Sequence, residues 1–150
     1  MGIIDDLIAN AGLYLGIGSD PTAERGQRRV QAARIAVAPL PNGAGVAVDY
    51  ETFNPADAAR LQPHIEHAVI ARLYGGGAIL VTAHSHADTV AVLKETSPGE
   101  FTLGDAEAPF PMAITISIPE PGHLVYVWSY AEPGGTPVPR DRADLTLRRA

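Results

Sequence analysis

Two histidines on one predicted strand are the residues best suited to proton transfer or metal binding. His84 and His86 lie two positions apart in a β-rich run over residues 78–86. Side chains two positions apart on a strand point to the same face. Glu66 shares a face with His64 in the preceding run. If both faces line one enclosed space, His84 or His86 can act as a general acid or base with Glu66 or a tyrosine as its partner.

The same residues also meet the ligand requirements of a metal site, since two imidazoles and a carboxylate are sufficient. Histidines on strands next to loops are equally typical of surface or hydrogen-bonded structural positions, so the pattern leaves three roles open. The chain contains no cysteine, which excludes disulfides, thiolate metal ligands and a cysteine nucleophile. We predict neither a metal nor another cofactor.

A second set of candidates consists of aromatic side chains with hydrogen-bonding tips. Tyr126, Trp128 and Tyr130 alternate along the run over residues 123–130 and therefore share a face. Such side chains combine a large apolar area with a polar end. They suit the wall of a ligand pocket, and they also suit the filling of a core.

Tyr50 joins this set because of the charges beside it. Asp49 and Glu51 share the opposite face of the run over residues 46–53, and alternating charges on a strand are typical of a solvent face. This assignment predicts that the other side chains of the run point inward, namely Val46, Val48, Tyr50 and Thr52.

One short helix and a series of strands would have to position these residues. Apolar residues recur at helical spacing in residues 2–10, with Asp5 and Asp6 near the positive end of the helix dipole. The remaining chain has short β-rich runs bounded by Gly, Pro and Asn clusters. These runs cover residues 13–18, 30–39, 46–53, 64–73, 78–86, 89–95, 101–103, 112–118, 123–130 and 145–148.

Frequent turns between short strands indicate an all-β sandwich or barrel, and no βαβ rhythm or fixed repeat is present. We find no linker, so we treat residues 1–150 as one domain. The predicted fold is a single antiparallel up-and-down β-barrel of about eight to ten strands with a short N-terminal helix.

Three short segments in chain order resemble the calycin group, which includes lipocalins, fatty-acid-binding proteins and nitrobindin-like barrels. Gly12-Leu-Tyr-Leu-Gly-Ile-Gly18 is similar to a nitrobindin-like opening in which tryptophan is expected at the position of Tyr14. Leu80-Val-Thr-Ala-His84 resembles a mid-barrel strand, and Leu145-Thr-Leu-Arg-Arg149 resembles a closing strand. The resemblance implies a ligand-binding barrel.

The resemblance also raises haem binding as an alternative. In nitrobindin-like haem proteins, a histidine shortly before the closing strand ligates the iron. Here that stretch reads Asp141-Arg-Ala-Asp144, and no histidine follows His123. The missing ligand disfavours haem.

The overall charge and hydropathy restrict the partners. The net charge of −6 argues against a nucleic acid, because phosphate binding requires a basic face. No apolar run reaches the roughly 18 residues that a spanning helix needs. Residues 1–11 contain Asp5 and Asp6 and lack the basic region of a signal peptide, so we expect a cytoplasmic protein. The sequence leaves a homodimer open.

The barrel pattern and the aromatic face together favour binding or carriage of a small, mostly apolar molecule inside the barrel. The predicted ligand-binding residues are Tyr50, His84, His86, Tyr126, Trp128 and Tyr130. The alternatives are a barrel enzyme of isomerase or cyclase type that uses His84, His86 and Glu66, and an interaction module whose interior is filled by side chains. We favour the non-catalytic interpretation.

Overall fold

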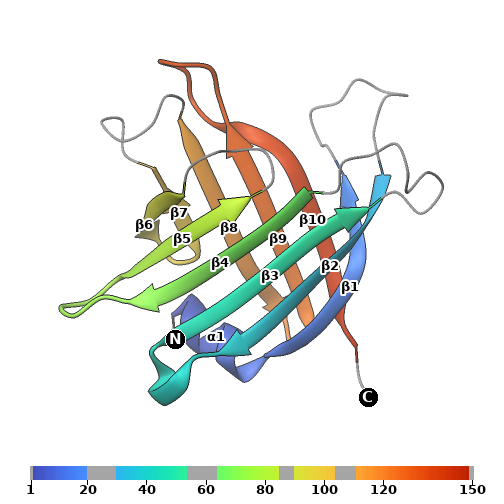
Figure 1. Ribbon diagram of the computed structural model, residues 1–150, viewed down its shortest axis with the longest axis vertical. Helices are drawn as coiled ribbons and strands as arrows, with labels where there is room; N and C mark the ends of the chain where they lie inside the picture. The colour runs from blue at the N-terminus through green and yellow to red at the C-terminus, as the bar shows by residue number, and fades with distance from the viewer. Residues whose placement is uncertain (1, 20–29, 54–63, 85–89, 104–110, 149–150) are drawn as a thin grey trace.

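Over the residues that the structure describes, the protein folds into a closed barrel of ten antiparallel strands with one short helix (Figure 1). The computed structural model describes residues 2–19, 30–53, 64–84, 90–103 and 111–148. Each strand pairs with its neighbours in sequence, and the first strand pairs with the last. The predicted all-β, up-and-down barrel with an N-terminal helix is confirmed. Its elements are α1 (Ile3–Ala9), β1 (Gly12–Ser19), β2 (Val30–Pro39), the 3-10 turn η1 (Pro41–Gly43), β3 (Gly45–Phe53), β4 (His64–Arg72), β5 (Ala78–His84), β6 (Ala91–Ser97), β7 (Glu100–Thr102), β8 (Met112–Glu120), β9 (His123–Tyr130) and β10 (Val138–Leu147).

The last strand differs most from its prediction. β10 begins at Val138, whereas the sequence indicated a strand only from Leu145. Pro139 has no N–H for a strand ladder, so this stretch reads as a loop. The structure accommodates the proline by a shift of register between Pro139 and Asp141 in the pairing with β9. Asp141 therefore lies on a strand.

The strands separate an inner face from an outer face by simple alternation. In β3 the side chains of Val46, Val48, Tyr50 and Thr52 are buried, as predicted. Asp49 on the same strand is exposed. The charges on one face of this strand were therefore a correct guide to the inside of the barrel.

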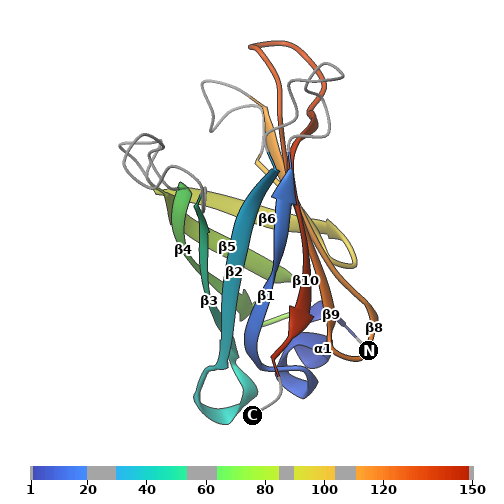
Figure 2. The same cartoon turned by 90° about the vertical axis from the view of Figure 1, so that its right-hand side faces the viewer.

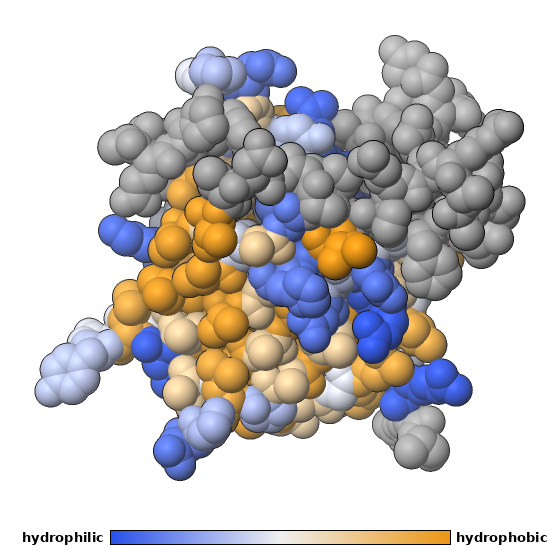
Figure 3. All heavy atoms as spheres, in the orientation of Figure 1, coloured by the Kyte–Doolittle hydropathy of each residue, from blue (hydrophilic) through white to orange (hydrophobic). Residues whose placement is uncertain are grey.

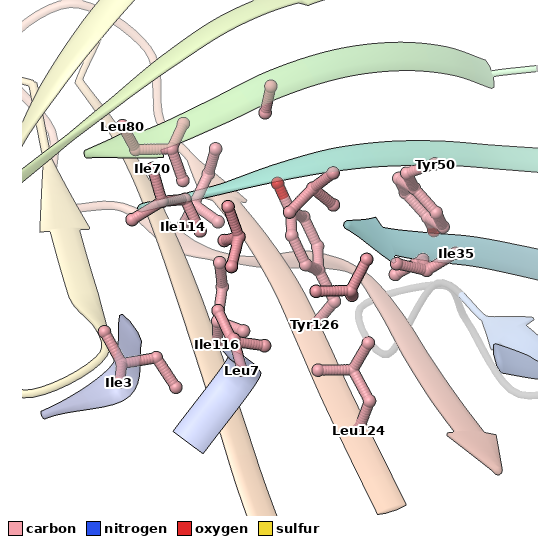
Figure 4. Packing of buried hydrophobic residues seen from close by; sticks show 14 of the residues in the cluster. Ile3, Leu7, Ile35, Tyr50, Ile70, Leu80, Ile114, Ile116, Leu124 and Tyr126 are labelled. Atoms are coloured by element: carbon pink, nitrogen blue, oxygen red, sulfur yellow. The ribbon is translucent and has the colours of Figure 1, made fainter. Parts of the chain in front are cut away.

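Helix α1 closes one end of the barrel. Its buried side chains are Ile3, Ile4 and Leu7, and the helix contacts β2, β3 and β4 as well as β8 on the other side of the barrel. Figures 1 and 2 show it at the lower end of the strands. In the close-up of Figure 4, Leu7 lies beside Ile116 among other aliphatic side chains. We call this the α1 end; it is filled by apolar packing. No helix within the described residues is long and apolar enough to cross a lipid bilayer.

An ion pair holds α1 against the end of β4. Nη2 of Arg72 lies 2.6 Å from Oδ1 of Asp5, and Nε of Arg72 donates to the carbonyl of Gly43 at 2.9 Å. The hydrogen bond from Arg72 is the main reason that the pKa of Asp5 is lowered from its ordinary value of 3.8. Arg72 thereby connects the helix to the end of β4 and to the turn between β2 and β3.

This ion pair predicts a stability difference that depends on pH. Because the pKa of Asp5 is lowered in the folded protein, the stabilisation is present above the ordinary carboxyl pKa and is lost as the pH falls through the lowered value. Urea midpoints of wild type and Asp5→Asn should therefore differ at neutral pH and converge in acid. Asp6→Asn removes the same charge from the same helix and is the control. A constant difference between wild type and Asp5→Asn across this range would contradict the prediction.

Candidate functional site

A fully buried acid, Glu66 on β4, is at the centre of the candidate site. Its side chain has 0% exposure. Oε1 accepts hydrogen bonds from the hydroxyls of Thr82 and Tyr126, each at 2.7 Å. Oε2 accepts one from the indole Nε1 of Trp128, also at 2.7 Å. Hydrogen bonds to a carboxylate are stronger than those between neutral groups, so the three donors hold this side chain in one position.

The donors come from two sides of the barrel. Thr82 is on β5, which is hydrogen-bonded to β4, and lies diagonally across from Glu66. Tyr126 and Trp128 are on β9, which is separated from β4 by four strands in the closed sheet. They are two positions apart, so both point inward. Glu66 therefore connects opposite walls through the interior.

A second carboxylate is bound to a buried tyrosine beside this group. The hydroxyl of Tyr50 donates to Oδ2 of Asp141 at 3.1 Å. The rings of Tyr50 and Tyr126 are 5.3 Å apart and tilted by 35°, which is a favourable aromatic contact. We call Glu66, Thr82, Tyr126, Trp128, Tyr50 and Asp141 the interior polar cluster.

Both tyrosines keep their protons in this environment. Burial is the largest cause of the raised pKa of Tyr50, and the charges of Asp141 and Glu66 raise it further. Burial also raises the pKa of Tyr126 well above 10, with a further contribution from the charge of Glu66. The two hydroxyls therefore remain hydrogen-bond donors at physiological pH.

His84 borders the cluster at the end of β5. It is the cross-strand neighbour of Glu66. Its ring lies edge-on to the ring of Trp128, with centroids 5.2 Å apart and an angle of 68° between the planes. The side chain is half-buried, so it lies between the buried acid and the surface.

The interior polar cluster lies in the half of the barrel away from α1. Tyr50 is near the end of β3, Glu66 near the start of β4 and Asp141 near the start of β10. Because the strands alternate in direction, these positions share one end of the barrel. In Figure 4 the ring of Tyr126 extends away from Leu7 and Ile116, with Ile70, Leu80 and Ile114 on one side of it and Tyr50 on the other. The barrel thus has an apolar half and a polar, aromatic half.

Five residues singled out from the sequence meet in this half: Tyr50, Glu66, His84, Tyr126 and Trp128. Tyr130 does not join them. Tyr130 alternates in step with Tyr126 and Trp128, but it lies at the end of β9 and is 45% exposed. The guanidinium of Arg140 lies over its ring, 5.3 Å from the centroid. Its place in a ligand pocket stays a prediction, and the structure puts it at the rim of the barrel rather than in the buried interior.

Two predicted positions lie outside what the structure describes, namely His86 and the side chain of His64. Within the described residues, no three histidine or acidic side chains are grouped closely enough to hold a metal ion.

Sequence reasoning missed two members of the cluster. Thr82 shares a face with His84, so alternation along that strand could have found it. Asp141 lies before the predicted strand over residues 145–148, and no local signal places it inside.

The fold and this cluster define a class: a helix-capped, ten-stranded antiparallel barrel with an acid-centred network of aromatic donors inside one half. Neither a scan against models of known protein families nor a search of curated proteins gives a match. The resemblance to calycin barrels therefore stays a prediction.

Proposed function

We propose that this protein binds a small, mostly apolar molecule in the polar half of the barrel, with a polar group of the ligand directed toward the interior polar cluster. Binding sites of this kind combine apolar and aromatic walls with a few fixed polar groups. Tyr50, Tyr126 and Trp128 supply aromatic surface, and Asp141 and His84 lie half-buried where the cluster approaches the solvent.

The burial of Glu66 is the observation that carries this proposal. Desolvating a carboxylate is unfavourable even when hydrogen bonds compensate it. The α1 end shows that this chain can fill its barrel with aliphatic side chains. An acid with three bound donors in the other half therefore suggests a role that apolar packing would not meet. Specifying the fold is the competing role, and ligand measurements distinguish the two.

Trp128 provides a direct test because it is the single tryptophan of the chain and its indole is bonded to Glu66. We expect decanol, decanal or decanoate, added to the purified protein, to change its fluorescence with saturable dependence on concentration. Native mass spectrometry of the same samples should show one bound molecule per chain. Absence of both signals for every compound would contradict the proposal and leave the cluster with a structural role.

A matched pair of variants localises the binding. Tyr50→Phe removes a buried hydroxyl that bonds Asp141, and we expect it to weaken binding by about tenfold, the equivalent of one hydrogen bond. Tyr74→Phe makes the same chemical change at a fully exposed position in the turn after β4 and should leave the affinity unchanged. Equal effects of the two variants would place the ligand elsewhere.

An acid–base enzyme of isomerase or cyclase type is the second candidate. It is supported by the position of His84 directly across from Glu66 on the neighbouring strand. A ligand found by the binding measurements would then be converted during incubation, and chromatography of the extracted compound would show a product that His84→Gln no longer forms. Recovery of the unchanged ligand from wild type would favour a carrier.

A further inference from the structure

The outer face of β4, β5 and β6 is apolar where a solvated barrel wall would alternate with polar residues. Val69, Val81 and Val92 stand side by side in one row across the three strands. Val69 is 38% exposed and Val92 is 41% exposed. Below this row, Ala71 on β4 is paired with Ile79 on β5. We call these five residues the outer valine face.

Exposed apolar side chains at both ends of β4 and before β6 enlarge this face. They are Ile65, Leu73 and Val90, with exposed fractions of 40%, 43% and 59%. Figure 3 shows apolar side chains gathered over this side of the molecule, where β4 and β5 run in Figure 1. A contiguous apolar patch on a protein surface is typical of an interaction site.

The outer wall is polar over β8 and β10, whereas β1 also carries the exposed apolar side chains of Leu15 and Ile17. The outward side chains of β8 include Thr115 and Ser117, and those of β10 include Arg142 and Asp144. Arg142 and Asp144 are joined by an ion pair of 2.8 Å. Outward apolar side chains on β4, β5 and β6 are therefore not a requirement of every strand in this barrel.

Opposite charges lie at two diagonal corners of the outer valine face. Lys94 on β6 is paired with Ile79, on the side of the valine row nearer α1. Asp49 on β3 is paired with His67, on the other side of that row, and its Oδ1 lies 2.6 Å from Nδ1 of His67. Lys94 and Asp49 are both exposed, so both are accessible to an approaching surface.

We propose that the outer valine face is the interface of a homodimer. A two-fold axis that lies in the plane of the face, perpendicular to the line from Lys94 to Asp49, packs the valine row of one copy across that of the other. The same half-turn brings Lys94 of each copy to Asp49 of its partner, so that two equivalent ion pairs flank the apolar contact. Strands of the two copies then cross near a right angle, which is one of the two common arrangements of packed sheets. A self-complementary patch of this kind is what a two-fold interface requires.

The first test is the mass of the full chain in solution. Sedimentation equilibrium should give a dimer that dissociates on dilution. Val92→Glu places a charge on the interface at a side chain that is already 41% exposed, and it should produce a monomer with unchanged far-UV circular dichroism. Thr115→Glu introduces the same charge on the outer face of β8 and should remain dimeric. A wild-type monomer at every accessible concentration, or a dimer that survives Val92→Glu, would overturn the proposal.

A charge exchange tests the proposed arrangement of the two copies, separately from the apolar character of the face. Lys94→Asp puts two acids together in each flanking pair and should weaken the dimer by about tenfold in dissociation constant. Adding Asp49→Lys to that variant restores opposite charges and should recover most of the affinity. Failure of the double variant to recover, with both single variants folded, would exclude this arrangement of the two copies.

Discussion

Replacing Glu66 with alanine should lower the free energy of unfolding by about 3–5 kcal/mol, since it removes the acceptor of three buried donors. The largest effect is at Trp128. Its indole N–H can only donate a hydrogen bond, and the alanine variant lacks the acceptor, Oε2 of Glu66. Alanine also leaves a cavity in a position with 0% exposure. Urea denaturation followed by circular dichroism measures the loss.

Glu66→Gln separates the charge of this side chain from its hydrogen bonds. The amide oxygen can accept from Trp128, while the amide nitrogen faces Thr82 and Tyr126, whose hydroxyls can rotate and accept. We expect a smaller loss, about 1–2 kcal/mol. Glu51→Ala is the control. It removes an acid from the outer face of β3 whose Oε1 is 4.0 Å from Nη1 of Arg34, and surface pairs of this kind contribute about 1 kcal/mol or less. Equal losses for Glu66→Ala and Glu51→Ala would show that the three buried bonds do not stabilise the fold.

Gly16→Ala should be the second severe substitution, with a loss of about 3 kcal/mol or more. Gly16 lies on β1 opposite Leu145 of β10, at the seam that closes the barrel. A Cβ atom there would lie 2.0 Å from the carbonyl oxygen of Asp144 and 2.8 Å from Cα of Leu145. Both are backbone atoms, so only a separation of the two strands relieves the clash.

Gly18→Ala, two residues along the same strand and also facing inward, is the matched control. Its Cβ would meet Cγ2 of Thr52 at 3.4 Å and Cβ of Ala33 at 3.7 Å, which are ordinary contacts. We expect a change within about 1 kcal/mol. Thermal unfolding of the two variants side by side provides the comparison. A Gly16→Ala protein as stable as Gly18→Ala would show that β1 and β10 can move apart at little cost.

The barrel could be predicted from local patterns because turn residues and β-rich runs are local properties. The runs over 30–39 and 123–130 coincide with β2 and β9. The acids of β3 also identified which face of that strand points inward. Each of these inferences needs only residues that are close together in the sequence.

The candidate site could be predicted only in part, because its contacts join distant residues. Alternation brings Tyr126 and Trp128 to one face, but it does not reveal that Glu66 of β4 lies across from them. Asp141 lies outside the predicted last strand, because β10 begins seven residues earlier than predicted and includes a register shift between Pro139 and Asp141. Tyr130 alternates in step with Tyr126 and Trp128, but it lies at the end of β9, where the rim of the barrel leaves it exposed.

The β1–β10 seam has a consequence for how the chain acquires its structure. Residues 14–19 of β1 pair with residues 142–147 of β10, and such distant pairings form slowly because a long loop must close first. During synthesis, β1 emerges early and keeps one open edge until β10 has left the ribosome. That edge carries Leu15 and Ile17, which stay 40% and 57% exposed even in the finished barrel. Nascent chains should therefore be most prone to aggregation and most dependent on chaperones before the tenth strand is made.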